Sequence, residues 1–563
     1  MKKILILLIL TSCQSLILGN KNNKYSAVSG QNFMIATADK VASEVGAEIL
    51  AKGGNAVDAT IAAQMVLNVV EPESSGIGGG LFLLYFDAKT KKTLYFNGRE
   101  ISPSAVNEKI FLDKNGNVRE FKDVVIGGLS VGTPGALYAL QSAHKKYGKL
   151  PWKDLFVPAI KIARDGFVLN KRIHSTLKKE SGLNSLEGMR IYFEDGGEPK
   201  DVGTIIKNPA LAKTFETIAS QGIKPFYEGK IARKIVAAVR ESKINPGYLS
   251  LADMSQYRDK TGDLLCAKYR EKYKVCSMPL PSSGGIAVLE MLGILENFDL
   301  EKIKPSSLAA VHLLSEAARL AYSDRNEYVA DIPNVPIQQM LDKQYLLERS
   351  KLISLKKALG KVEPGKFTKS AEPLNKEFEK PSTTHIAAVD KEGNAVSMTS
   401  SIEYFFGSGL VVEGFMLNNE LTDFSLTPKI NGKKVANRVR PKKQPRSTMS
   451  PVFIFDSENN LLMAVGSAGG SRIAQYVLKT IVAHLDWGLD IQQSISLPNH
   501  LILDDVIEIE AGTKLQNLKS DLEKMGHKVV VKEITSGLQG IAINKNQITG
   551  GADPRRNSSA IGH

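Results

Sequence analysis

The sequence has few of the residues that most often bind metal ions, with eight His and three Cys among 563 residues. The histidines are dispersed, no His-Glu-x-x-His occurs, and the cysteines lack the spacing of zinc ligands. We therefore predict no metal site and no cofactor. His385 is interpreted as a strand residue and not as a ligand.

Two further absences exclude nucleic acids and nucleotides as expected ligands. The formal net charge is +14, but no long basic run with interleaved aromatics occurs, so the positive charge favours solubility and attraction for anionic ligands. The glycine-rich stretch 74–80 lacks the Gly-Lys-Ser or Gly-Lys-Thr ending of a phosphate loop, and a strand pattern follows it where such a loop needs a helix.

The N-terminus has the pattern of an export signal. Met1-Lys2-Lys3 precedes the apolar stretch 4–10, which is far shorter than the about 20 residues that span a bilayer. Residues 10–13, Leu-Thr-Ser-Cys, resemble the lipobox of bacterial lipoproteins, so 1–12 is predicted to be the signal, Cys13 the lipidated residue and 13–32 a tether. The alternative is a conventional signal that is cut slightly later. Both interpretations predict export to the periplasm or cell surface, and the first adds a lipid anchor in a membrane surface.

Export leads to an oxidising compartment, in which disulfides form. Cys266 and Cys276 lie symmetrically about residues 270–272, as facing positions of a hairpin would. A disulfide and two reduced strand cysteines are equally compatible with this pattern.

Helical and strand patterns follow one another in blocks. Spacing and cap residues predict helices over 43–50, 55–72, 308–322, 473–485 and 513–524, and paired apolar runs predict hairpins over 81–96, 383–400 and 451–465. Between 351 and 381 the composition shifts to Lys, Glu, Pro and Ser, as expected for an exposed connector that is open to cleavage. The order of elements predicts a layered α/β arrangement with sheets in the middle.

Several segments resemble the gamma-glutamyltranspeptidase family: residues 53–59 (Gly-Gly-Asn-Ala-Val-Asp-Ala), 279–285 (Pro-Leu-Pro-Ser-Ser-Gly-Gly), 466–472 (Gly-Ser-Ala-Gly-Gly-Ser-Arg), and the stretch from Thr383-Thr384-His385 to 418–424. The likeness extends from about residue 33 to the C-terminus. It implies a four-layer αββα sandwich of the N-terminal nucleophile hydrolase type, formed jointly by two subunits. Self-cleavage between Ser382 and Thr383 would give a large subunit, 33–382, and a small subunit, 383–563, that stay together as a heterodimer.

The resemblance implies that Thr383 is the nucleophile, that Ser401 hydrogen-bonds it, and that the N–H groups of Gly469 and Gly470 stabilise the oxyanion. A threonine hydroxyl is a weak nucleophile until a base takes its proton, and a freed α-amino group with a reference pKa of about 7.7 to 8.0 can do so. Before cleavage that nitrogen is an amide, so we expect the precursor to be inactive. The ordinary alternatives are a strand threonine, a solvated serine and a glycine turn.

The resemblance also implies how the substrate is held. Arg99 matches an arginine that binds the substrate α-carboxylate through two hydrogen bonds, and Ser447 and Thr448 match a hydroxyl pair that binds the same group. Glu420 and Asp423 match positions that hold the α-ammonium group. We expect the opposite charges on opposing walls of the site.

Glu403 departs from the family, which has asparagine there in its best-studied members, and a third carboxylate deepens the negative potential around an ammonium group. This change either strengthens recognition of glutamate or favours another ligand. The segment 424–445, a flap in lid-bearing members, is basic and somewhat shortened. The leading prediction is γ-glutamyl transfer from glutathione or a related amide to water, an amino acid or a dipeptide. A glutaryl-type (cephalosporin) acylase or a γ-polyglutamate hydrolase is the alternative within this chemistry, and a non-processing peptide-binding lipoprotein is the alternative of another class.

Overall fold

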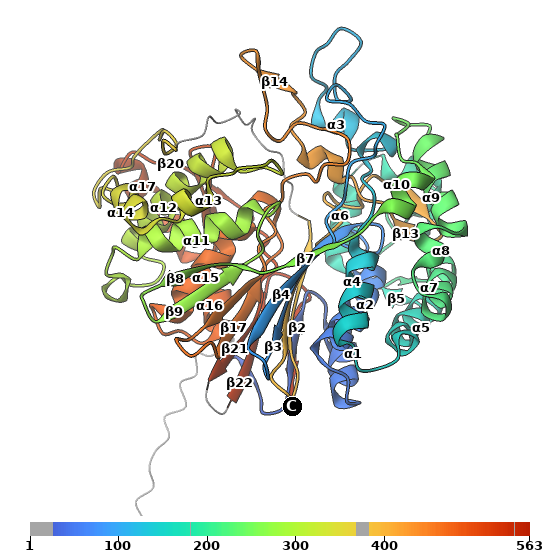
Figure 1. The fold of residues 1–563 in the computed structure, drawn as a ribbon, viewed down its shortest axis with the longest axis horizontal. Helices are drawn as coiled ribbons and strands as arrows, with labels where there is room; N and C mark the ends of the chain where they lie inside the picture. The colour runs from blue at the N-terminus through green and yellow to red at the C-terminus, as the bar shows by residue number, and fades with distance from the viewer. Residues whose placement is uncertain (1–25, 181, 368–381, 545–546) are drawn as a thin grey trace, which may run out of the picture.

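The computed structural model describes residues 26–180, 182–367, 382–544 and 547–563. Two antiparallel sheets stack face to face, and helices cover the outer face of each, so the predicted four-layer αββα arrangement is confirmed (Figure 1). The first sheet has the spatial order β23 (Ser559–Gly562), β2 (Met34–Thr37), β10 (Thr384–Val389), β11 (Ala395–Ser401), β3 (Gly80–Asp87), β4 (Lys92–Asn97) and β7 (Lys260–Gly262). The second has the order β1 (Val28–Gly30), β22 (Gln547–Ala552), β21 (Gln539–Asn544), β17 (Leu461–Gly466), β16 (Val452–Phe455), β9 (Tyr273–Ser277) and β8 (Leu265–Tyr269).

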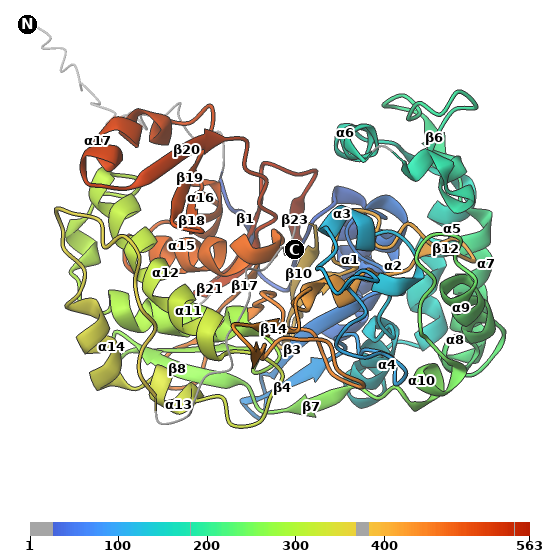
Figure 2. The ribbon, with the colours of Figure 1, turned by 90° about the horizontal axis from the view of Figure 1, so that it is seen from above.

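Each sheet has its own helical layer, and the two layers lie on opposite sides of the molecule (Figure 2). The first sheet packs against α1 (Lys40–Ala51), α2 (Ala56–Val70) and α4 (Ala136–Tyr147), with α5 (Val157–Asp165), α7 (Pro209–Gln221), α8 (Lys224–Tyr227) and α9 (Lys230–Arg240) outside them. The second packs against α11 (Ser283–Leu295), α15 (Ile473–Leu485) and α16 (Ile491–Ser496), with α12 (Leu308–Tyr328) and α14 (Lys343–Ser350) further out.

Local sequence signals explain why α2 begins where it does. The Asn55 side chain accepts from the N–H of Asp58, and the Asp58 side chain accepts from the N–H of Asn55, which is the capping box that the sequence predicts. Every residue of this helix is buried, because the first sheet lies on one side of it and α4 and α5 on the other.

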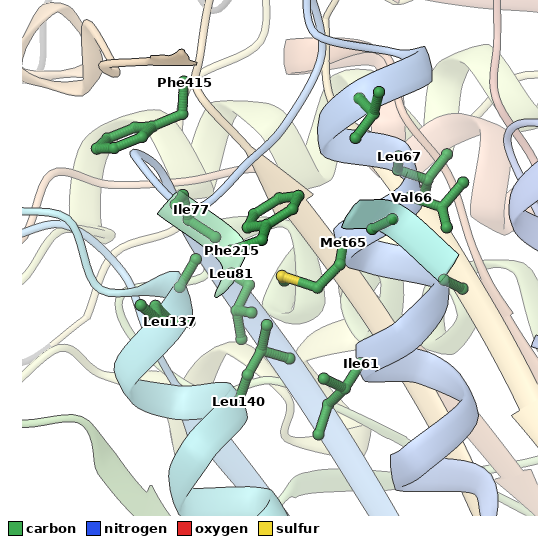
Figure 3. Close-up of a cluster of buried hydrophobic side chains, with 14 of the residues drawn as sticks. Ile61, Met65, Val66, Leu67, Ile77, Leu81, Leu137, Leu140, Phe215 and Phe415 are labelled. Atoms are coloured by element: carbon green, nitrogen blue, oxygen red, sulfur yellow. The ribbon is translucent and has the colours of Figure 1, made fainter. Parts of the chain in front are cut away.

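Strand β3 shows how one segment serves two cores. Its alternate residues Leu81 and Leu83 belong to the apolar cluster under α2, whereas Phe82 and Leu84 belong to the cluster between the sheets. Figure 3 shows the first cluster, in which side chains from α2, β3, α4 and α7 converge: Ile61, Met65, Leu81, Leu137, Leu140 and Phe215. Because β3 is covered on both faces, its sequence is a continuous apolar run.

Two segments have a structure other than the one that the sequence predicts. Residues 28–32 are not part of a tether, because Val28–Gly30 pairs with β22 and the N–H groups of Gln31 and Asn32 donate to the C-terminal carbonyl of His563. The predicted helix over 513–524 is a 3₁₀ segment, Lys514–Leu518, followed by the short α17 (Lys519–Lys524).

Cys266 lies directly opposite Cys276 in the β8–β9 hairpin, and the two sulfur atoms form a disulfide. Of the alternatives that the sequence leaves open, the structure contains the disulfide. Cys13 and the export signal lie outside the described residues. In the described part of the chain, no helix is both long and apolar enough to cross a membrane.

Candidate active site

The β10–β11 hairpin brings the predicted nucleophile next to Ser401. Its register pairs Thr384 with Ser400, so Thr383 and Ser401 come together at the open end of the hairpin. The Thr383 Oγ1 atom lies 3.1 Å from Ser401 Oγ, which also accepts from the N–H of Glu403 at 2.9 Å. The two predicted hydroxyl groups therefore form a hydrogen bond, and both residues are buried.

The peptide bond between Ser382 and Thr383 is held on both sides. The Ser382 carbonyl accepts from the N–H of Gly469 at 3.2 Å, and the Ser382 hydroxyl donates to the carbonyl of Glu73 at 2.9 Å. The Thr383 carbonyl accepts from Arg556 Nη1 at 3.0 Å. Thr383 has a φ of 88°, a conformation that is strained by about 1–3 kcal/mol for a residue that is not glycine.

A glycine is required at position 469 for this contact. Its φ is 137°, which L side chains rarely adopt, and an added Cβ would lie 2.7 Å from the ring of Tyr476. The absence of a side chain lets this N–H point at the Ser382 carbonyl.

Next to the two hydroxyl groups is a cavity of about 20 Å³, which has room for about one water molecule. Eight of the predicted site residues line it, together with Met449 and Ile473: Arg99, Thr383, Ser401, Glu403, Glu420, Asp423, Ser447 and Gly470. Substrate therefore cannot enter without movement of the lining side chains.

The Arg99 guanidinium occupies the acidic part of this lining. It donates to Glu420 Oε1, to Asp423 Oδ2 at 2.5 Å, and to the backbone carbonyls of Pro445 and Arg446 at 3.2 and 2.8 Å. The expectation of opposite charges on opposing walls is therefore wrong for this state, because Arg99 and the two carboxylates are in direct contact. All three side chains are buried.

Burial and mutual contact shift the pKa values of Arg99 and of the acids around it. It raises the pKa of Glu420 and that of the neighbouring Glu100 to about 8, although the Arg99 charge opposes the rise, and it raises the pKa of Asp423 well above its usual range. Burial by itself would lower the pKa of Arg99, but Glu420 and Asp423 outweigh burial and raise it. Near neutral pH Arg99 is therefore charged, and protons are distributed among the carboxyl groups of Glu100, Glu420 and Asp423.

Of the two remaining predicted residues, Glu403 and Thr448, only the first lines the cavity. Glu403 lies at the cavity, and its Oε2 accepts from Asn419 Nδ2. Thr448 is not brought to the cavity: its hydroxyl accepts from Arg325 Nη2 at 2.6 Å, on the α12 side. Of the predicted hydroxyl pair, Ser447 lines the cavity and Thr448 does not, and carboxylate binding by the pair stays a prediction.

Sequence reasoning missed the contribution of Arg556, which fixes the Thr383 carbonyl and lies 3.6 Å from Glu71. It is 173 residues from Thr383 in the chain, and no spacing relates the two. Glu100, whose carboxylate lies 3.8 Å from Arg99, was also missed, although it is the next residue in the chain. The signal in the sequence was the consecutive charged residues Arg99 and Glu100 just after strand β4.

His385 does not line the cavity. It lies in β10, where its Nδ1 is 2.9 Å from Thr399 Oγ1, and burial lowers the pKa of its ring to about 3. Among the described residues, one group with the composition of a metal site lies elsewhere: His312, Glu316 and His527.

Comparisons with known proteins show which proteins the chain is similar to. The family model described as Gamma-glutamyltranspeptidase matches residues 42–563. A glutathione hydrolase proenzyme of Bacillus subtilis (strain 168) is 37% identical over 95% of this chain and 92% of its own length, and one of Escherichia coli (strain K12) is 35% identical over 95% and 93%. Among solved structures, a cephalosporin acylase from Bacillus halodurans superposes with a TM-score of 0.83 and 26% identity over 99% of both chains. A gamma-glutamyltranspeptidase chain from Helicobacter pylori superposes with a TM-score of 0.54 and 31% identity, over 59% of this chain and 97% of that one.

Proposed function

Since the chain belongs to the gamma-glutamyltranspeptidase family, we propose that Thr383 is the residue with which it cuts its own backbone and then attacks its substrate. The chain is an enzyme of this family, a γ-glutamyltransferase and glutathione hydrolase that is made as a proenzyme and matures by self-cleavage. The proposal assigns 33–382 to the large subunit and 383–563 to the small one.

The proposal is supported by one observation above all: the N–H of Gly469 donates to the carbonyl oxygen of Ser382. The hydroxyl that would attack this carbonyl belongs to the next residue, Thr383. Attack by Thr383 Oγ1 forms a C–O bond, and the N–H stabilises the charge that develops on the oxygen. The C–N bond then breaks, and the nitrogen takes up a proton. Water hydrolyses the resulting ester, which frees the Ser382 carboxylate and the Thr383 α-amino group.

The freed amine supplies the base that the precursor lacks. In the mature enzyme it takes the proton from Thr383 Oγ1, which attacks the γ-carbonyl of the donor and forms a γ-glutamyl ester, while the N–H groups of Gly469 and Gly470 bind the oxyanion. The proton passes to the leaving amine. Water, or the amine of an amino acid or dipeptide, then releases the γ-glutamyl group.

The charged lining fits a γ-glutamyl donor, which carries a carboxylate and an ammonium group at one carbon. In this proposal Arg99 and Ser447 bind the carboxylate, and Glu403, Glu420 and Asp423, which line the same cavity, bind the ammonium group. Export and a lipid anchor at Cys13 remain part of the proposal. Mass analysis of the mature N-terminus in a membrane fraction tests them, and an unmodified N-terminus beyond residue 13 excludes the anchor.

A denaturing gel and N-terminal sequencing test the cleavage. We expect two fragments from the wild type, with the smaller one beginning at Thr383, and one intact, inactive chain from Thr383→Ala. Thr384→Ala is the matched control, since it removes a buried threonine hydroxyl that has no hydrogen-bond partner among the described residues. A Thr383→Ala chain that is still cut at this bond would refute the assignment.

A pair of substrates tests the donor. We expect the mature enzyme to release aniline from a γ-glutamyl anilide much faster than from a glutaryl anilide, which lacks the ammonium group. A preference for the glutaryl compound would replace γ-glutamyl transfer by glutaryl acylase activity.

A further inference from the structure

Arg556 is a buried cation that contacts the backbone of the proposed nucleophile. It lies between β22 and β23, and β23 is separated from β10 by the single strand β2 (Figure 2). Its Nη1 donates to the Thr383 carbonyl at 3.0 Å, and its Nε donates to the Ser536 carbonyl at 2.9 Å. Two hydrogen bonds from one planar guanidinium fix where the positive charge lies.

The surroundings of Arg556 keep this charge in place. A Cβ on Gly537 would lie 2.8 Å from Arg556 Cζ, so a larger residue there would displace the guanidinium. Asp553, an acid close by in the chain, is paired with Arg555 at 3.1 Å. Burial and the nearby Arg172 lower the pKa of Arg556 to about 10, so the side chain still carries its proton at neutral pH.

The charge is close to the nitrogen that cleavage would turn into the α-amino group. The nitrogen and the carbonyl oxygen of one residue are about 2.7–3.6 Å apart, so Arg556 Nη1 lies within about 6.6 Å of the Thr383 nitrogen. Thr383, Ser536 and Arg556 all lie after the proposed cut, so cleavage does not separate them. A cation at this distance disfavours the protonated form of an amine.

The acids at the cavity act in the opposite direction. Glu403, Glu420 and Asp423 line the same cavity as Thr383, and in their ionised forms they attract an ammonium group. Arg99 opposes them, but it is in direct contact with Glu420 and Asp423. These acids favour a protonated α-amino group, which cannot accept the proton of the Thr383 hydroxyl.

Acids near Arg556 offset only part of its charge. Glu71, which follows α2, lies 3.6 Å from Arg556 Nη1, and Arg172 of α6 (Lys171–Lys179) lies 3.7 Å from Glu71 and 2.9 Å from Glu73. Burial raises the pKa of Glu71 to about 7, although Arg556 and Arg172 oppose the rise. Near neutral pH Glu71 is therefore only partly ionised, and two arginines face less than two negative charges.

We propose that Arg556 is a positioning residue for the catalytic base: its charge, held on the Thr383 carbonyl, keeps the freed α-amino group unprotonated near neutral pH. This inference rests on the proposed cleavage at Thr383. Arg556 also lines a cavity of about 920 Å³, whose water screens the charge. For charges about 6 Å apart and an effective dielectric constant between about 20 and 80, the charge moves the titration of the amine by about 0.5–2 pH units.

The test is the pH dependence of kcat/KM for a γ-glutamyl anilide, measured on matured enzyme between about pH 5 and about pH 9.5, since its low-pH limb reports the protonation of the base. Arg556→Gln keeps an amide donor for the Thr383 carbonyl but removes the charge. Its low-pH limb should lie about 0.5–2 pH units higher, so kcat/KM at about pH 6 should be about 3–100-fold below that of the wild type, with a smaller difference above about pH 9. Arg556→Lys keeps the charge and should keep the wild-type midpoint.

Two further variants complete the set. Glu71→Gln removes the negative charge beside Arg556 and should move the low-pH limb to lower pH, by a smaller amount because Glu71 is only partly ionised there. The matched control is Arg270→Gln, which removes an arginine that is paired with Asp486 in the β8–β9 turn and should leave the profile unchanged.

A ratio of Arg556→Gln to wild-type kcat/KM that is the same at every pH would show that Arg556 only holds the carbonyl in place, and it overturns the proposal. An Arg556→Lys profile displaced as far as that of Arg556→Gln does the same. If Arg556→Gln does not mature, a displaced limb in Arg556→Lys, or an unmoved or higher one in Glu71→Gln, overturns it. N-terminal sequencing of the wild type separates the two failures, because a fragment beginning at Thr383 together with a constant ratio contradicts only the role of Arg556.

Discussion

Ser401 and its neighbour Ser400 provide a sharp test of how the nucleophile is activated. Both are buried serines of β11, and each makes a hydrogen bond through its hydroxyl. Ser401 Oγ bonds to Thr383 Oγ1, whereas Ser400 Oγ donates to the carbonyl of Gly80 at 3.0 Å. Replacing either by alanine removes one buried hydroxyl, but only one of the two changes touches the reacting group.

The expected magnitude follows from the hydrogen bond that Ser401→Ala removes. The Thr383 oxygen exchanges a proton during attack, and a hydrogen bond to such a group contributes about 1.5–3 kcal/mol. Because about 1.36 kcal/mol changes a rate tenfold, self-cleavage of Ser401→Ala should be about 10–150 times slower than that of the wild type. Ser400→Ala should lower the free energy of unfolding by about 1 kcal/mol and leave the cleavage rate unchanged.

The rate is measured by refolding the denatured precursor, stopping samples at intervals and quantifying the intact band on a denaturing gel. Ser401→Thr restores a hydroxyl at the same position and should recover most of the rate. Equal slowing by Ser401→Ala and Ser400→Ala would show that the effect is loss of packing in β11 and would refute the role given to the hydroxyl.

Three further outcomes are expected. Gly469→Ala should reduce cleavage by about 10²–10³-fold, because it displaces the N–H on the scissile carbonyl; wild-type kinetics would exclude this N–H as the donor. Arg99→Lys should raise the KM for the donor by about tenfold or more, because lysine cannot make the bidentate hydrogen bond to the donor carboxylate. The fraction of cleaved chain on a gel should be unchanged. The folded enzyme without substrate holds a proton on Glu420 more tightly than the unfolded chain does, because burial raises the pKa of Glu420 to about 8. This proton therefore contributes fully to the free energy of unfolding below the ordinary carboxyl pKa, and the contribution is lost as pH rises through about 8. Donor binding should instead tighten over the same rise, as ionised Glu420 pairs with the ammonium group; a KM that is independent of pH, or unchanged in profile in Glu420→Gln, would contradict this.

Features encoded by residues close in the chain could be predicted from the sequence. The capping box of Asn55 and Asp58 fixes the start of α2, and the turn after Val389 fixes a hairpin in which Thr383 and Ser401 must meet. Both follow from local hydrogen bonding and from the two-residue repeat of strands, which do not depend on the rest of the fold.

Contacts between distant segments could not be predicted. The pairing of Arg99 with Asp423 joins residues 324 positions apart, and the His312–His527 contact joins residues 215 positions apart. The histidines are dispersed along the chain, but separation in the sequence says nothing about distance after folding, so this contact could not be foreseen. Thr448 was placed by its neighbour Ser447, yet consecutive residues of an extended segment point to opposite sides, which is why its hydroxyl meets Arg325.

The closed state of the charged site bears on its choice of substrate. In the uncleaved chain Arg99 is in direct contact with Glu420 and Asp423, and the cavity has room for about one water molecule. A γ-glutamyl donor can replace both sides of this contact, because its carboxylate pairs with the guanidinium as its ammonium group pairs with the acids. A glutaryl group can replace only one side: it pairs with the guanidinium but supplies no cation for the acids, which must then take up protons. The exchange of the contacts between Arg99 and its two acids for contacts with both charged groups of the ligand thus favours γ-glutamyl over glutaryl donors.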